Sequence, residues 1–113
     1  MAKRNIADMD HIEANILDTF ITLMREKVRI HNVVLFGSRA RGDAEPDSDM
    51  DVLVIVDDLT EEMEEYISEC AWKAGFEHGI VVVPVIFSRN DWENGPERYS
   101  LLAEAIRLEG VYL

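Results

Sequence analysis

The sequence predicts an α/β fold in which a small β-sheet is covered by helices. Two observations lead to this fold class. Apolar residues recur at three- and four-residue spacing in several segments, which is the period of a helix with one buried side. Between these segments lie short apolar runs bounded by glycine, proline and aspartate, a pattern typical of buried strands. The predicted order is helix, strand, insert, strand, helix, strand, helix, which favours a layered α/β arrangement.

The first predicted helix runs from Asp8 to Arg29, with Asp8 or Asp10 as its N-cap. Its apolar positions are Met9, Ile12, Ile16, Leu17, Phe20, Ile21, Met24 and Val28. His11 and His31 lie near its ends. A metal or catalytic role for either is one alternative, and a solvated surface position is the interpretation we favour.

Two short apolar runs, 33–36 and 52–56, are predicted strands on either side of a polar insert. A second helix follows, capped by Thr60 and ended by Gly75. Its inward positions are Met63, Tyr66, Ile67, Cys70, Ala71 and Ala74. We interpret its glutamates as a solvated face rather than metal ligands, and Cys70 as an inert buried thiol rather than a reactive one.

The third predicted strand spans 79–87 and is apolar without alternation, which predicts burial on both faces. Pro84 indicates an edge position or a bulge, because proline cannot donate to a strand ladder. Residues 88–91 resemble a capping motif for a short helical turn that includes Trp92. A last helix is predicted from Pro96 to Gly110, with Tyr99, Leu102, Ala103 and Ile106 facing inward. Residues 111–113 are expected to dock as an extended segment.

The polar insert between the first two strands carries the chemistry. Gly37-Ser38 ends the first strand, and Asp49 and Asp51 open the second. Side chains two apart on a strand share a face, so the two carboxylates are expected together, where they repel unless a cation lies between them. Mg²⁺ suits one or two carboxylates combined with substrate phosphates.

The remaining polar residues of the insert suit a phosphate group. Gly37 allows a tight turn and close approach of a ligand, and Ser38 offers a hydroxyl and backbone N–H groups. Arg39 and Arg41 add positive charge near the same anion. Each residue also has an ordinary structural explanation as a turn glycine, a cap, a loop aspartate or a surface ion pair. Their combination favours a metal–nucleotide site.

The pattern Gly37-Ser38-x₃-Gly42-x₅-Ser48-Asp49-x-Asp51, followed by apolar residues, resembles the signature of DNA polymerase β-like nucleotidyltransferases. Within that superfamily the chain is similar to the minimal nucleotidyltransferase (MNT) domains of bacteria and archaea. The resemblance implies a small mixed sheet and one MNT domain over residues 1–113. It also implies that Asp49 and Asp51 are catalytic and hold Mg²⁺ or Mn²⁺. Gly37, Ser38, Arg39, Arg41 and Ser48 are then the residues that bind a nucleoside triphosphate, ATP in the first place.

One departure from the family pattern leaves the activity open. Active members carry a third carboxylate on the next strand, but residues 80–87 include no Asp or Glu, and Glu77 lies too early. Val81, Val82 and Val83 are the candidates for the vacant position. One hypothesis is therefore a nucleotidyltransferase that transfers a nucleotidyl group, such as AMP, to a partner protein. The alternative is an impaired, antitoxin-like interaction module that binds a helical HEPN-type partner, the partner that the resemblance implies.

Composition narrows the functional classes. The chain has 113 residues and a formal net charge of −12, which argues against extended nucleic-acid binding. The single Cys70 excludes an intramolecular disulfide framework and suits a reducing cytoplasm. No apolar run approaches the roughly 18 residues of a membrane span. We therefore expect a cytoplasmic chain with no membrane partner, and a homo-oligomer stays open.

Overall fold

The computed structural model describes residues 6–96 and 100–113, which form a mixed four-stranded sheet with helices on both faces. The strand order is β3-β2-β1-β4, with bounds β1 Ile30–Phe36, β2 Met50–Val56, β3 Val82–Ser88 and β4 Val111–Tyr112. Strand β1 is antiparallel to both β2 and β4, whereas β2 and β3 are parallel. The predicted fold class, including the small mixed sheet, is confirmed.

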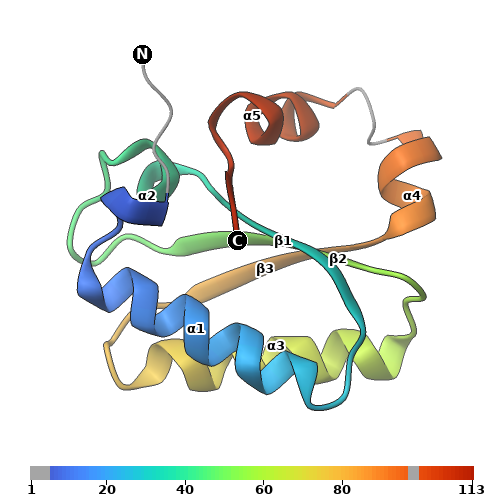
Figure 1. Ribbon diagram of the computed structural model, residues 1–113, viewed down its shortest axis with the longest axis horizontal. Helices are drawn as coiled ribbons and strands as arrows, with labels where there is room; N and C mark the ends of the chain where they lie inside the picture. Colours follow the sequence, from blue (N-terminus) through green and yellow to red (C-terminus); the bar gives the residue numbers. More distant parts are fainter. Residues whose placement is uncertain (1–5, 97–99) are drawn as a thin grey trace.

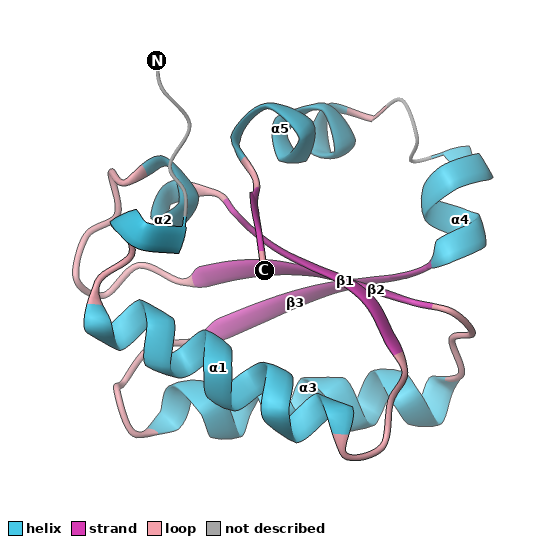
Figure 2. Cartoon of the chain, viewed as in Figure 1, coloured by secondary structure: helices cyan, strands magenta, loops and turns pink. Residues whose placement is uncertain are grey.

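The helices divide between the two faces of the sheet. In the described part of the chain they are η1 Ile6–Asp8, α1 His11–Arg25, α2 Ser38–Arg41, α3 Glu61–Phe76, α4 Arg89–Asn94 and α5 Leu101–Glu109. Helices α1 and α3 lie side by side on one face, and α4 and α5 lie on the other (Figure 1). Figure 2 shows the strands between these two layers.

Each face of the sheet has its own apolar core. Phe20 and Met24 of α1 and Ile67 of α3 pack with one side of the strands, and Ala40 of α2 belongs to the same cluster. The opposite, smaller core surrounds Ile106 of α5 and comprises Val34, Phe36, Leu53 and Ile55 of the strands. Alternation along a strand sends neighbouring side chains to opposite faces, so β2 contributes to both cores.

Helix α1 is shorter than the predicted 8–29. Asp10 is the N-cap, and its carboxylate accepts a hydrogen bond from the Glu13 backbone N–H at 2.7 Å while the Glu13 side chain accepts one from the Asp10 N–H. This is a capping box. The helix ends at Arg25, followed by a turn from which Val28 still reaches the core. The helical spacing of apolar residues in the sequence therefore extends beyond the end of the helix at Arg25.

The structure shifts several other predicted boundaries. Strand β1 begins at Ile30 and β2 at Met50, so both are longer than predicted. Thr60 caps α3 as predicted, and the helix ends at Phe76, one residue beyond Gly75. Cys70 is buried, as predicted, and burial raises the pKa of its thiol.

Strand β3 differs from its prediction in where it begins and in how deeply it is buried. It begins at Val82 rather than at residue 79, and after that buried residue its side chains are half-buried. Burial on both faces was therefore a wrong prediction. The strand lies at the edge of the sheet, as Pro84 indicated, and an edge strand is covered less completely than a central one.

The C-terminal elements largely match the prediction. Ser88 caps α4 by accepting a hydrogen bond from the Asp91 N–H. The last helix begins at Leu101, after a Ser100 cap, rather than at Pro96, and Ala103 and Ile106 face inward as expected. Tyr99 lies outside the described residues. The predicted terminal segment docks as β4, pairing antiparallel with β1.

Candidate functional site

The site lies where β1 ends and β2 begins. Phe36, the last residue of β1, pairs with Asp51 of β2, so the Gly37-Ser38 turn follows directly beside that carboxylate. Gly37 has φ +77° and ψ −158°, a conformation that is essentially restricted to glycine. A Cβ atom added at Gly37 would clash with Asp51 Oδ2. Glycine is thus required both by the backbone and by its contact with the carboxylate.

Asp49 and Asp51 are close enough to affect each other electrostatically. Partial burial raises the pKa of Asp51, the charge of Asp49 raises it further, and the charge of Arg41 opposes both effects. Asp49 itself is exposed, just before the first residue of β2. Two carboxylates that repel each other beside a glycine turn form a set of hard oxygen donors, which is the ligand type that Mg²⁺ and Mn²⁺ prefer.

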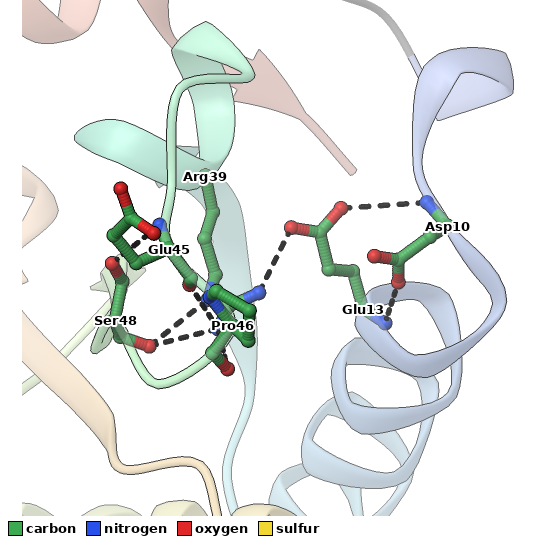
Figure 3. A network of polar contacts seen from close by, with 6 residues as sticks. All are labelled: Asp10, Glu13, Arg39, Glu45, Pro46 and Ser48. Carbon is green, nitrogen blue, oxygen red and sulfur yellow. Dashed lines mark hydrogen bonds and ion pairs between the residues drawn. The ribbon is translucent and has the colours of Figure 1, made fainter.

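Arg39 occupies a different environment from the one expected for a phosphate ligand. It is only 5% exposed, and its Nη1 donates to Glu13 Oε2 of α1 at 3.2 Å. Its Nε and Nη2 donate to the backbone carbonyl of Ser48, and Nη2 also donates to that of Pro46 (Figure 3). The guanidinium therefore joins α1 to the loop that leads into Asp49. Sequence reasoning missed Glu13 in this role, because it lies 26 residues from Arg39 and its capping pattern with Asp10 gives no sign of the pair.

Arg41, two residues later in α2, lies at the surface. Its Nε donates to Asp43 at 3.2 Å and its Nη1 to Glu109 of α5 at 3.2 Å, and its side chain is 42% exposed. These carboxylates raise the pKa of Arg41. Exposed ion pairs are weakly held. The charge of Arg41 also acts on Asp51 and opposes the rise in the pKa of that carboxyl.

Ser38 and Ser48 shape the two ends of the insert. The Ser38 carbonyl accepts from the N–H groups of Gly42 and Asp43, which closes the short helix α2. The Ser48 hydroxyl accepts from the Glu45 N–H at 2.9 Å, and the Ser48 N–H donates back to the Glu45 carbonyl. Ser48 therefore fixes the turn that precedes Asp49.

The parallel pairing of β2 with β3 identifies the residue at the vacant third position. Asp51 is in register with Val83, so these side chains share a face of the sheet. Val82 points the other way, into the α1–α3 core. Within residues 6–96 and 100–113, no group of three His, Cys, Asp or Glu side chains is placed to hold a metal ion. A hydrocarbon side chain therefore lies beside Asp51 on this strand.

The remaining sequence candidates lie away from the site or at the surface. His11 and His31 are both exposed. In the described part of the chain, none of the helices has the length and apolarity needed to cross a bilayer.

Comparison with known proteins identifies the family. The family model for the nucleotidyltransferase domain matches residues 17–111, which include every predicted site residue. The chain belongs to the nucleotidyltransferase domain family.

Two relatives of this nucleotidyltransferase domain come from Methanocaldococcus jannaschii. The protein named "Putative protein adenylyltransferase MJ0141" is 33% identical over 69 residues, which cover 60% of this chain and 68% of that protein. The protein named "Putative protein adenylyltransferase MJ0604" is 30% identical over 79 residues, covering 67% and 74%.

Solved structures with the same fold are MNT antitoxins of HEPN–MNT pairs. One is a toxin–antitoxin complex with AMP-PNP, with a TM-score of 0.59 and 22% identity over 84% of this chain and 69% of that chain. Another is a tri-AMPylated Shewanella oneidensis HEPN toxin in complex with MNT antitoxin, with a TM-score of 0.54 and 20% identity over 89% and 70%. At this level of identity the likeness supports the fold, and it confirms the predicted resemblance to MNT domains.

Proposed function

We propose that this nucleotidyltransferase domain binds ATP with Mg²⁺ or Mn²⁺ and transfers AMP to a hydroxyl group of a partner protein. The observation that carries the proposal is the contact of Gly37 with Asp51, with the charge of Asp49 acting on the same carboxylate. The names of the two relatives and the AMPylated toxin in a structural neighbour support AMP as the transferred group. A cytoplasmic location, where ATP is available, belongs to the same proposal.

The residues present fit a divalent cation. Asp49 and Asp51 supply hard oxygen ligands, and their mutual repulsion is relieved by a cation placed between them. When bound, the ion supplies Lewis-acid stabilisation of the charge that develops on the phosphoryl oxygens. Asp49 and Asp51 would hold the ion, and the ATP phosphates would complete its coordination.

The insert provides the space and the charge for the triphosphate. Gly37 presents a surface without a side chain beside Asp51, and Ser38 follows with its hydroxyl. Arg41 is held by exposed ion pairs, which cost little to exchange for a phosphate oxygen. Ser48 and Arg39 act indirectly, because they fix the loop that positions Asp49.

In the transfer itself, the acceptor oxygen attacks the α-phosphorus and the bond to the β-phosphate oxygen breaks, releasing pyrophosphate. The acceptor hydroxyl must lose its proton in this step. The described residues of β3 supply no carboxylate for it, since Val83 lies in register with Asp51. We therefore propose that the acceptor protein supplies the missing carboxylate, which would take up this proton, and that the chain alone turns over slowly.

The second candidate is an interaction module of the antitoxin type, which binds a helical HEPN-type partner without transferring AMP. The same Val83 favours it, because losing a metal ligand or base typically lowers a phosphoryl-transfer rate by orders of magnitude.

Incubation with ATP labelled at the α-phosphate, with and without the co-expressed HEPN-type partner, distinguishes these functions. We expect label on the partner, dependent on Asp49 and lost in Asp49→Asn. Efficient, Asp49-dependent labelling by the chain alone would show that two carboxylates suffice. Partner binding with no label at any metal concentration would leave the interaction module as the function.

A further inference from the structure

Two aromatic side chains project from the outer side of α3, away from both cores. Trp72 is 63% exposed and Phe76, one turn later, is 66% exposed. Their ring centroids are 4.8 Å apart, so they form one apolar surface. Val81, just before β3, is 62% exposed. Single exposed apolar residues are common, but a group of large ones commonly indicates an interaction site.

These side chains border a hollow between α3 and the edge of the sheet. Its volume is about 500 Å³, and it is lined by Trp72, Phe76 and Val81 together with Ser68, Gly75, Gly79, Ile80, Val82 and Pro84. We call this group the Trp72 surface. Its lining is predominantly apolar, as in the central part of protein interfaces, where aromatic residues are enriched.

The edge of β3 limits how a partner can bind to the Trp72 surface. Strand β3 is the outermost strand beside β2, and Pro84 within it has no N–H to donate. Adding a strand from a partner would leave one ladder position unpaired. Side chains that enter the hollow are therefore better suited to this surface than an added strand.

The negative charge of α3 and of the whole chain indicates what kind of partner suits the Trp72 surface. Helix α3 contains five glutamates and one lysine, and that lysine, Lys73, is paired with Glu69. The whole chain carries a net charge of −12. A second copy would place like charges against each other, whereas a surface with lysines and arginines around an apolar centre is complementary. We propose that the Trp72 surface docks a protein partner whose apolar side chains are flanked by basic residues.

The Trp72 surface ends next to the strand that carries the site. The Met50 N–H donates to the Val81 carbonyl at 2.9 Å, and Met50 lies between Asp49 and Asp51. If the proposed function holds, the docked partner is the acceptor protein; the docking surface itself does not depend on that function.

A designed peptide provides the test. In a Trp92→Phe variant, Trp72 is the remaining tryptophan of the two in the sequence. We expect a helical leucine–lysine peptide to shift the emission of Trp72 to shorter wavelength, and the matched leucine–glutamate peptide to leave it unchanged. A shift of the emission with both peptides, or with neither, would overturn the proposal that the partner is basic.

Matched variants locate the binding by anisotropy of a labelled leucine–lysine peptide. Trp72→Ser with Phe76→Ser should lower its affinity at least about tenfold, the usual scale for removing aromatic anchors. Leu101→Ser with Leu108→Ser is the control, since these leucines are 85% and 71% exposed on α5 and should leave the affinity within about twofold. Equal affinities of the two double variants would show binding by charge elsewhere and overturn the proposal.

Two further measurements separate the alternatives. A dimer in sedimentation experiments that is lost in the Trp72→Ser, Phe76→Ser variant would show a second copy as the occupant and overturn the assignment of a basic partner. Asp51→Asn should keep the peptide affinity. Peptide binding by a chain that gives no Asp49-dependent labelling of a HEPN-type partner would count against the proposed function while supporting the docking surface.

Discussion

At the residue scale, the two arginines of α2 illustrate how burial separates side chains of the same type. Arg39 is buried against Glu13 and the loop carbonyls, whereas Arg41 is held at the surface by Asp43 and Glu109. Both were expected near a phosphate, and the sequence alone does not distinguish them. The difference arises because the loop folds back over one arginine and leaves the other exposed.

Replacing Arg39 should therefore be far more costly than replacing Arg41. Arg39→Met removes the guanidinium that pairs with the buried carboxylate of Glu13, and removing one partner of a buried pair costs about 3–5 kcal/mol. Arg41→Met, the matched control, should change the free energy of unfolding little. Urea denaturation of both variants measures this difference. Equal losses would show that the Glu13–Arg39 pair does not stabilise the fold.

Asp51 allows a test of the predicted carboxylate repulsion without metal. Its pKa is raised in the folded state by burial and by Asp49, so its ionised form destabilises the fold. The destabilisation is absent below the ordinary pKa of 3.8 and fully present above the raised folded-state pKa. Asp51→Asn should thus unfold at the same or a slightly higher temperature at neutral pH, with a difference that disappears on acidification.

Asp47→Asn, an exposed change in the same loop, is the control for this measurement. A strongly destabilised Asp51→Asn protein would instead indicate that this carboxylate holds the fold together.

At the element scale, the register of β2 and β3 decides a question that the sequence left open. Val81, Val82 and Val83 were equal candidates for the vacant position. An unbroken apolar run does not show which of its residues face which side of the sheet. The pairing of Asp51 with Val83 selects Val83. The same run misled the prediction of burial, since an edge strand and a central strand share this composition.

Val83→Asp should therefore create a third carboxylate beside Asp49 and Asp51. We expect tighter Mn²⁺ binding by calorimetry, because each added carboxylate raises the affinity for a hard cation. Val83→Asn, in which asparagine is similar in shape to aspartate but uncharged, should bind Mn²⁺ no better than the unmodified chain. Val82→Asp would bury a charge in the α1–α3 core and should destabilise the fold. Equal Mn²⁺ affinity of the Val83→Asp and Val83→Asn proteins would place the site elsewhere.

Other elements could be predicted because their signals are local. Thr60 and Ser88 cap their helices as expected from a hydroxyl preceding a helix, and β4 was anticipated from an apolar segment after Gly110. The Gly37-Ser38 and Asp-x-Asp elements were visible as motifs. The Glu13–Arg39 pair was not, since its members are 26 residues apart and meet only in the folded chain.

At the scale of the whole molecule, stability should respond to ligands that bind only the folded state. Mg²⁺ with ATP should raise the melting temperature more than ATP with EDTA, by an amount equivalent to about 2.7 kcal/mol at a hundredfold excess over Kd. NaCl at matched ionic strength is the control, because a chain with a net charge of −12 is also stabilised by screening. Identical melting curves with Mg²⁺–ATP and with NaCl would argue against a nucleotide site.

The bond between Glu13 and Arg39 also determines which parts of the molecule open together. When α1 frays at its N-terminus, Arg39 loses the carboxylate that helps to hold its guanidinium against the turn around Pro46. The first turns of α1 and the loop before Asp49 should then form one cooperative opening unit. In native-state hydrogen exchange, the Ala14 and Ser48 amides, which donate to Asp10 and Glu45, should report similar opening free energies. In Arg39→Met both amides should exchange faster, the Ser48 amide by the larger factor, because the loop then opens independently of the helix.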